Sequence, residues 1–123
     1  MAEILFTDRE LDVMAVLWDM GSGTVAEVKD RLSDPLAYTT VLTILRTLEE
    51  KGRIAHKEQG RAYRYYPLVQ RTEARESHVS RLTRKLFQDS PELLITQLLG
   101  DESLTREQLK RLRTLLDGRI GRK

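Results

Sequence analysis

The chain has 123 residues, of which 40% are hydrophobic and 33% are charged. This length suits one core of ordinary domain size with an appended element, and it is too short for two full domains. Because there are no cysteines, disulfides, thiolate metal sites and cysteine nucleophiles are excluded. No stretch approaches the roughly 20 apolar residues of a transmembrane helix, and the start lacks a secretion signal, so we expect a cytoplasmic protein without membrane insertion.

The net charge of +2 conceals an uneven distribution along the chain. Residues 1–34 carry three basic and eight acidic side chains, residues 35–89 carry eleven and six, and residues 90–123 carry seven and five. The middle of the chain is therefore its basic part. This segregation favours a surface that attracts a polyanion, with random clustering of solvated charges as the alternative.

Two capping boxes predict where the first two helices begin. Thr7 and Glu10 form the first box, and the apolar stripe that follows it ends at a Gly-Ser-Gly sequence. Thr24 and Glu27 form the second box, and the short helix that it opens ends before Pro35. Both helices are expected to belong to the core.

A third helix is predicted from about Tyr38 or Thr39 to Lys51, with Gly52 as its left-handed stop. Its apolar residues fall on one face: Val41, Ile44, Leu45 and Leu48. The opposite face carries hydroxyls and one guanidinium: Thr39, Thr40, Thr43, Arg46 and Thr47. Three helices in this order, joined by short turns, are typical of a helix-turn-helix unit whose third helix enters the DNA major groove.

After the third helix the pattern of apolar residues changes to a period of two. Residues 53–57 and 62–66 predict two short strands, and Gly60 suits the turn at residues 58–61 because this turn requires a positive φ. Pro67 lacks an amide donor and is expected to end the second strand. A hairpin in this position is the wing of a winged helix-turn-helix domain.

The wing is expected to contribute cations and packing. Three basic side chains lie on it: Lys57, Arg61 and Arg64. Each would bind the DNA backbone or the adjacent minor groove with salt-dependent and sequence-independent affinity. Tyr63 and Tyr65 share one face of the second strand, and we expect them to pack against the helices rather than stack on bases.

The remaining residues predict three more helices. They cover about residues 72–88, residues 91–99 after a Ser90 cap, and a last stretch from the Thr105 capping box to Gly118. These helices are rich in leucine and too short to close a core, so a second copy of the chain would complete it. The leucines expected at this interface are Leu82, Leu86, Leu94, Leu98, Leu109, Leu112 and Leu116. The alternative is that these helices fold back on the first domain in a monomer.

The predicted fold is mainly α with a small β-hairpin wing. Residues 1–70 would form the winged helix-turn-helix DNA-binding domain, and residues 71–123 would form a helical dimerisation domain. No catalytic, metal or cofactor site is expected, because His56 and His78 are isolated and no phosphate-binding loop, nucleophile elbow or zinc motif occurs. An enzyme is therefore improbable.

The outer face of the third helix suits DNA. Thr39 and Thr40 lie at the helix N-terminus, where free amides also bind phosphate. Thr43 presents a methyl group that suits a thymine methyl, and Arg46 can pair with guanine or hold a phosphate. For a single threonine, capping and solvent exposure are an alternative explanation.

Two further functions remain open. The domain could serve protein association without specific DNA binding, but a protein-docking helix typically carries exposed Leu, Phe or Trp anchors. A small-ligand sensor is also possible in principle, although the sequence shows no pocket signature.

Three segments resemble the BlaI/MecI penicillinase-repressor family: residues 7–18 (TDRELDVMAVLW), 38–52 (YTTVLTILRTLEEKG) and 60–65 (GRAYRY). The resemblance spans nearly the whole chain, and residues 38–52 are its most specific part. It implies a homodimeric repressor of palindromic operators before β-lactamase or related resistance genes, with the C-terminal helices as the dimer interface.

The resemblance also implies how repression ends. In the family, a membrane-bound sensor metalloprotease commonly triggers cleavage of the repressor within its dimerisation helices. The similar place in this chain is Gln97-Leu98, whereas staphylococcal members have Asn-Phe there. The copper-responsive branch of the family binds metal through C-terminal cysteines, which this chain lacks.

Overall fold

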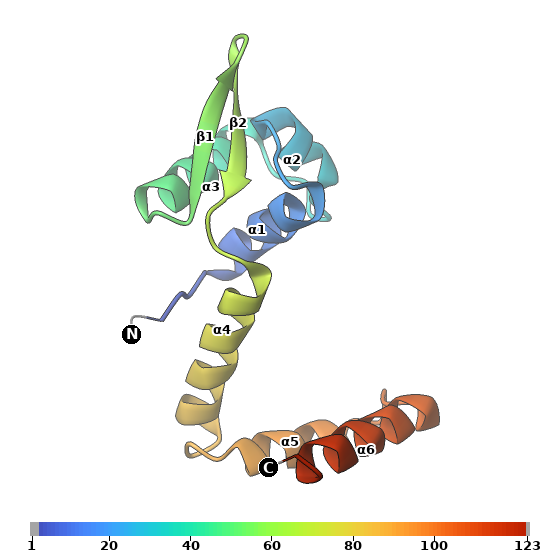
Figure 1. Cartoon of the computed structure of the whole chain (residues 1–123). Coiled ribbons are helices and arrows are strands. Elements are labelled where there is room, and N and C mark those ends of the chain that lie inside the picture. Colours follow the sequence, from blue (N-terminus) through green and yellow to red (C-terminus); the bar gives the residue numbers. More distant parts are fainter. Residues whose placement is uncertain (1–2, 123) are drawn as a thin grey trace. The chain divides into compact units, whose positions relative to one another are not determined.

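A computed structural model describes residues 3–122, and in this range the chain forms six helices and one hairpin (Figure 1). The elements are α1 (Asp8–Met20), α2 (Val25–Arg31), α3 (Tyr38–Glu50), β1 (Ile54–Gln59), β2 (Ala62–Pro67), α4 (Arg71–Leu86), α5 (Pro91–Leu99) and α6 (Arg106–Ile120). The expected fold, mainly helical with a small hairpin, is confirmed. Packing divides the chain into a first unit that extends to Ser80 and a second unit that starts at Arg81.

The first two capping boxes form as predicted. The Thr7 hydroxyl accepts a hydrogen bond from the Glu10 amide, and the Glu10 carboxylate accepts one from the Thr7 amide at 2.8 Å. Thr24 and Glu27 make the same two bonds at the start of α2. Each cap contributes about 1 kcal/mol to its helix.

The core of the first unit lies between α1, α2, α3 and the hairpin. Its most deeply buried side chains are Val13, Met14, Leu17, Val28, Val41, Leu45, Leu48, Ile54 and Tyr65. Three of these come from the predicted inner face of α3, and Ile44 packs partly buried against them. Because one face of α3 is fixed in the core, its opposite face is held towards solvent.

The hairpin is longer than the sequence predicted. Strands β1 and β2 pair antiparallel from Ile54 opposite Pro67 to Gln59 opposite Ala62, so the turn contains only Gly60 and Arg61. Gly60 has φ +62°, and glycine in the first position of a two-residue turn is typical of type II′ hairpins. The prediction of a four-residue turn was wrong. The residues of β1 near the tip are polar and exposed, so they do not show the alternation of apolar and polar side chains that indicates a strand.

The wing is held by contacts with α2 and with the residues just before that helix. The Gly23 amide donates to the Tyr65 carbonyl and the Tyr65 amide donates to the Gly23 carbonyl, both at 2.9 Å. Arg64 makes an ion pair of 2.9 Å with Glu27. Strand β2 of the wing is therefore attached to the start of α2 by two neighbouring contacts.

A buried carboxylate connects the start of α1 to the end of α3. Glu10 is 5% exposed, and its second oxygen accepts a hydrogen bond from the Lys51 ammonium at 2.8 Å. Burial raises the pKa of Glu10, but the hydrogen bonds from Lys51 and the Thr7 amide outweigh it and leave the pKa below its ordinary value. The ionised form of Glu10 therefore stabilises the folded state.

This arrangement predicts an acid-dependent loss of stability. Because the folded pKa is lowered, the contribution of Glu10 is present above about pH 4.5 and is lost as the pH falls through the folded pKa. Glu10→Gln should lower the free energy of unfolding by about 2 kcal/mol at pH 7, since it removes a charged hydrogen bond. Urea denaturation at fixed protein concentration should show this gap shrinking at pH 3, and an equal gap at both pH values would contradict the assignment.

The C-terminal helices begin where predicted, but two of them end elsewhere. Ser90 caps α5, and Thr105 with Gln108 forms the capping box of α6. Helix α4 ends at Leu86 rather than at residue 88, because Gln88 and Asp89 have φ values of 48° and 60°. Gly118 does not stop α6, which continues to Ile120 with Gly121 as its C-cap.

The division between the two units lies inside α4, ten residues beyond the boundary expected at residue 70. The first half of α4 belongs to the first unit, because Ala74 is buried in its core and Ser77 accepts a hydrogen bond from the Ile4 amide. His78 accepts a hydrogen bond from the Phe6 amide and stacks on the Phe6 ring. His78 thus has a structural role in the first unit.

Candidate nucleic-acid interface

The outer face of α3 is exposed as predicted. Thr39, Thr40, Thr43 and Arg46 are exposed, and Thr47 is half-buried. These side chains follow one another along the helix face opposite the core. The face is therefore free to approach another surface closely, since threonine side chains are short.

The threonines divide into two groups by their hydrogen bonds. The Thr43 hydroxyl donates to the Thr39 carbonyl and the Thr47 hydroxyl donates to the Thr43 carbonyl, both at 2.9 Å. These two side chains keep a methyl group and an accepting oxygen for a ligand, which suits the thymine contact expected of Thr43. Within residues 3–122, the hydroxyls of Thr39 and Thr40 have no hydrogen-bond partner, so they can still donate to a phosphate.

The N-terminus of α3 is uncapped by any side chain. Its N-cap residue is Ala37, whereas a Thr or Ser hydroxyl caps α1, α2, α5 and α6. The Thr40 and Val41 amides bond to the Ala37 carbonyl, which leaves the amides before them available. An uncapped helix start with a positive dipole end suits a phosphate as its capping group.

Filling this cap should stabilise the protein and weaken its DNA binding. Ala37→Asp places a carboxylate where the phosphate would bind, and it should raise the free energy of unfolding by about 1 kcal/mol. The same carboxylate should weaken DNA binding at least tenfold, because it occupies the amides and repels phosphates. Ala37→Asn is the control, since it caps without charge, and should lose less affinity. Denaturation and fluorescence anisotropy measure the two effects, and a more stable variant with unchanged DNA affinity would contradict the prediction.

The predicted wing cations differ in their surroundings. Lys57 and Arg61 are exposed, with Arg61 in the turn at the hairpin tip and the Lys57 ammonium 5.6 Å from the centre of the Tyr66 ring. Arg64 instead bonds to Glu27 and to the Gln59 side chain. Lys57 and Arg61 therefore present their charges to solvent, whereas Arg64 holds the wing in place.

The two tyrosines of β2 do not behave alike. Tyr65 packs into the core as predicted, but Tyr63 is 47% exposed, so the prediction that both pack against the helices was wrong for Tyr63. Tyr63 lies nearer the hairpin tip, where the strands extend beyond the helices. Its ring stacks on His56 with 4.1 Å between ring centres, and His56 Nδ1 lies 2.6 Å from a Glu49 carboxylate oxygen.

Sequence reasoning did not identify Tyr38, His56 and Glu49 as neighbours of the candidate interface. Tyr38 is 50% exposed at the start of α3, and His56 and Glu49 join the wing to the end of the same helix. The strand alternation placed His56 and Tyr63 on one face, but only the structure shows their contact with α3. These residues border the predicted DNA-reading face.

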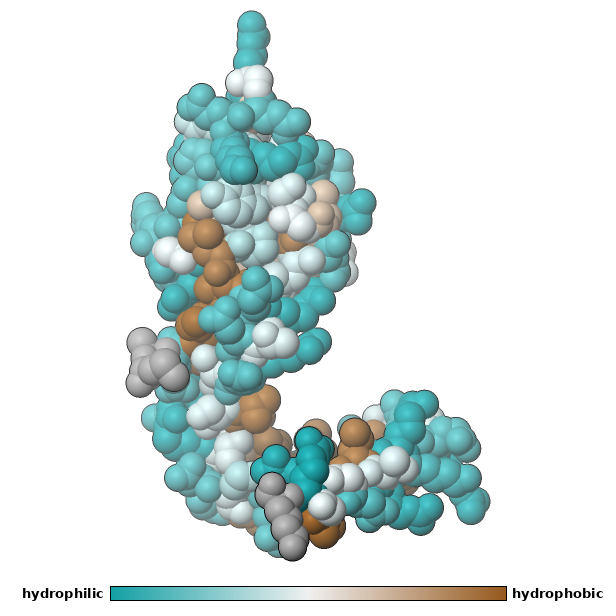
Figure 2. All heavy atoms as spheres, viewed as in Figure 1, coloured by the Kyte–Doolittle hydropathy of each residue, from teal (hydrophilic) through white to brown (hydrophobic). Residues whose placement is uncertain are grey.

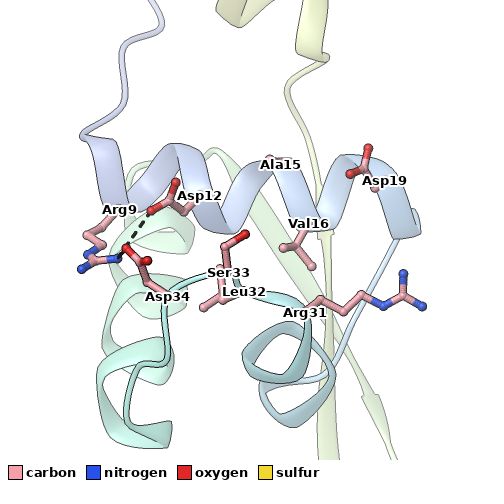
Figure 3. A pocket seen from close by; sticks show the side chains of 9 residues that line it. All are labelled: Arg9, Asp12, Ala15, Val16, Asp19, Arg31, Leu32, Ser33 and Asp34. Carbon is pink, nitrogen blue, oxygen red and sulfur yellow. Dashed lines mark hydrogen bonds and ion pairs between the residues drawn. The ribbon is translucent and has the colours of Figure 1, made fainter.

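A charged hollow lies between α1 and the segment that ends α2 and leads to α3. It measures about 270 Å³ and is lined by Arg9, Asp12, Ala15, Val16, Asp19, Arg31, Leu32, Ser33 and Asp34 (Figure 3). Arg9 pairs at 3.0 Å with Asp34 of the loop before α3 and at 3.6 Å with Asp12, one turn further along α1. This contact connects α1 to the loop between α2 and α3, so it positions the helix that carries the candidate site.

The leucines predicted for the dimer interface lie at the surface of the chain. Leu94 is half-buried, and the other six are between 37% and 68% exposed. Figure 2 shows such hydrophobic side chains among the hydrophilic surface of the C-terminal helices. None of the residues of α5 or α6 is buried within the single chain.

The part of the chain that the structure describes contains neither a metal site nor a membrane-spanning helix. No group of three His, Asp or Glu side chains there is arranged to hold a metal ion. No helix there is both long and apolar enough to cross a membrane.

Comparison with known proteins settles the family. The family model described as penicillinase repressor matches residues 6–118. The chain belongs to the penicillinase repressor family. The predicted resemblance is thereby confirmed, and since the family consists of transcriptional repressors, the chain is a DNA-binding repressor and not an enzyme.

Relatives match this family member over nearly its full length. The penicillinase repressor of Bacillus licheniformis is 26% identical over 119 residues, which cover 95% of this chain and 93% of the relative. The methicillin resistance regulatory protein MecI of Staphylococcus aureus is 20% identical and covers 88% of this chain and 89% of its own.

Solved structures agree with the winged-helix fold. The DNA-binding domain of the repressor BlaI superposes with a TM-score of 0.51 at 33% identity, over 55% of this family member and 85% of that domain. The oxidised form of MarR from E. coli has a TM-score of 0.52 at 19% identity, over 94% of this chain and 76% of its own, which shows likeness of fold alone. Helix α3 is thus the third helix of a winged helix-turn-helix domain.

Proposed function

We propose that this repressor binds a palindromic operator in the cytoplasm as a homodimer, with α3 of each subunit in the major groove. The observation that carries the proposal is the outer face of α3, which holds Thr39, Thr40, Thr43, Arg46 and Thr47, together with the exposed cations Lys57 and Arg61 on the wing that follows this helix. Threonine hydroxyls and helix amides suit phosphates, and arginine suits the guanine edge. The wing would follow the neighbouring backbone.

The exposed leucines support the homodimer. One recognition helix reads only a few base pairs, so two helices related by a twofold axis would read a palindrome. An isolated chain leaves apolar side chains such as Leu86 and Leu116 in water at 68% and 51% exposure. A second copy would cover them, because a twofold interface pairs each apolar surface with itself.

The family supports a proposal for the regulated genes and for the way repression ends. The operator would lie before a β-lactamase or related resistance gene, as the names of the relatives indicate. A membrane-bound sensor metalloprotease would relieve repression through cleavage of the dimerisation helices. Gln97 and Leu98 lie on α5 and are exposed, so a local opening of this helix would offer the bond between them to a protease.

Selection from a random DNA library tests the proposal. The wild-type protein should enrich one palindromic sequence, and sedimentation of the complex should give two chains for each duplex. An operator cut to one half-site should bind far more weakly, because only one recognition helix is engaged. If no sequence is enriched, the domain is a protein-interaction module rather than an operator-specific repressor.

A further inference from the structure

A groove separates the start of α3 from the outer half of the wing. It measures about 320 Å³ and is lined by Thr24, Val25, Ala26, Tyr38, Leu42, Arg61, Ala62, Tyr63 and Tyr65. Two phenol rings and one guanidinium dominate its open part, since Tyr38 and Tyr63 are about half exposed and Arg61 is exposed. The groove therefore offers two hydroxyl donors and one cation to a ligand.

Packing does not explain why these two tyrosines lie here. Tyr65, the next tyrosine on the same face of β2, is 2% exposed and fills the core, whereas Tyr63 extends beyond it into solvent. The Tyr63 ring is nevertheless held in place, because it stacks on His56 at 4.1 Å with 18° between the ring planes. An exposed aromatic ring that is fixed in advance loses little entropy when it binds a ligand.

Glu49 does not line the groove, and its carboxylate lies 2.6 Å from Nδ1 of His56, the ring on which Tyr63 stacks. The exposed charge that remains in the groove is that of Arg61. The groove is thus complementary to an anion.

The shape of DNA indicates which anion would lie in the groove. When a helix occupies the major groove, one sugar-phosphate strand borders it, and a wing contacts the backbone or minor groove beyond that strand. The strand must therefore pass between α3 and the wing. Residues of both elements line the groove that contains Tyr38 and Tyr63.

We propose that Tyr38 and Tyr63 bind the operator backbone, with each phenol hydroxyl donating to a phosphate oxygen while Arg61 supplies the opposing charge. This inference rests on the proposed placement of α3 in the major groove. The two tyrosines would position α3 along the major groove of the DNA, and they would contact no base. Tyrosine is among the residues that make such backbone contacts.

The double variant Tyr38→Phe with Tyr63→Phe tests this assignment. Phenylalanine keeps both rings and the stacking on His56, so only the two hydroxyls are lost. Anisotropy titration should show binding at least tenfold weaker, because a hydrogen bond to a charged group changes a binding constant by about tenfold or more. The loss should be equal for operator and unrelated DNA, since backbone contacts carry no sequence information.

The salt dependence separates the hydroxyls from the cation. The double variant should keep the wild-type slope of log K against log salt. Arg61→Gln should reduce the magnitude of this slope by about 0.9 for each subunit whose Arg61 contacts a phosphate. Tyr66→Phe is the matched control, because adjacent residues of β2 point to opposite faces and Tyr66 does not line the groove. This control should bind as the wild type does.

Three outcomes would overturn the inference. Unchanged affinity of the double variant would show that the hydroxyls make no contact, and a loss confined to operator DNA would assign them to bases. A loss as large in Tyr66→Phe would show a general effect of the substitutions. The wild type in the same titration tests the proposed function separately, since it must prefer the operator whatever the tyrosines do.

Discussion

Arg46→Ala is expected to remove the preference for the operator while it leaves binding to unrelated DNA almost unchanged. Arg46 is exposed on the outer face of α3, one turn beyond Thr43. A bidentate contact with guanine contributes about 1–3 kcal/mol of discrimination, and a dimer makes this contact twice. The ratio of operator affinity to unspecific affinity should therefore fall about 100-fold or more.

Competition titrations with operator and unrelated duplexes measure this ratio. Arg61→Ala is the control, because Arg61 lies at the wing tip and is expected to contact the backbone. It should weaken binding to both duplexes and flatten the salt dependence, without a change in their ratio. An equal loss on both duplexes for Arg46→Ala would show that Arg46 contacts a phosphate instead of a base.

The second large effect is expected in the proposed dimer. Leu112→Asp or Leu116→Asp should convert the dimer to monomers, because a carboxylate would be buried without a partner at the interface. Both leucines lie on one side of α6, and they are 37% and 51% exposed in the single chain. Sedimentation velocity should show a monomer, and affinity for the full operator should fall at least 100-fold because the half-sites are bound independently.

Thr114→Asp is the matched control for this experiment. Thr114 lies on α6 roughly opposite the line of Leu112 and Leu116, so its variant adds the same charge away from the proposed interface. It should remain dimeric. A wild-type chain that sediments as a monomer, or a Leu116→Asp variant that remains a dimer, would contradict the proposed interface.

Short-range chemistry made much of this fold predictable. The boxes at Thr7, Thr24 and Thr105 form as expected, because each needs only residues within one helical turn. The inner and outer faces of α3 were predictable for the same reason, since its apolar and hydroxyl residues repeat with the helical period. The outer face, Arg46 included, is therefore the part of the site that sequence alone could locate.

Long-range contacts set the limits of the prediction. Arg64 stays a predicted DNA contact, but its ion pair with Glu27 could not be predicted, because Glu27 lies 37 residues earlier in the chain and no local pattern connects the two. Tyr63 and Tyr65 have the same position in the strand alternation, and only the extent of the helices beneath them decides which one is buried. The pairing of His56 with Glu49 could likewise not be predicted from the sequence, because it forms only where the folded wing contacts α3.

Helix ends were missed for a different reason. The left-handed residues after α4 are Gln88 and Asp89, whereas a glycine would have been the usual signal for such a stop. Conversely, Gly118 was read as a stop, yet α6 continues through it. A glycine within a helix costs about 1 kcal/mol relative to alanine, which is too little to end a helix that its neighbours favour.

The attachment of the wing at Gly23 and Glu27 has a consequence for how fast the repressor finds DNA. Because the hairpin is bonded to the rest of the domain before any DNA is present, the distance between wing tip and recognition helix is already set. Association then needs no slow rearrangement, and encounter can be accelerated by the basic surface. Differences among operators should therefore appear mainly in dissociation rates, so that the lifetime of the complex decides which promoters stay silent.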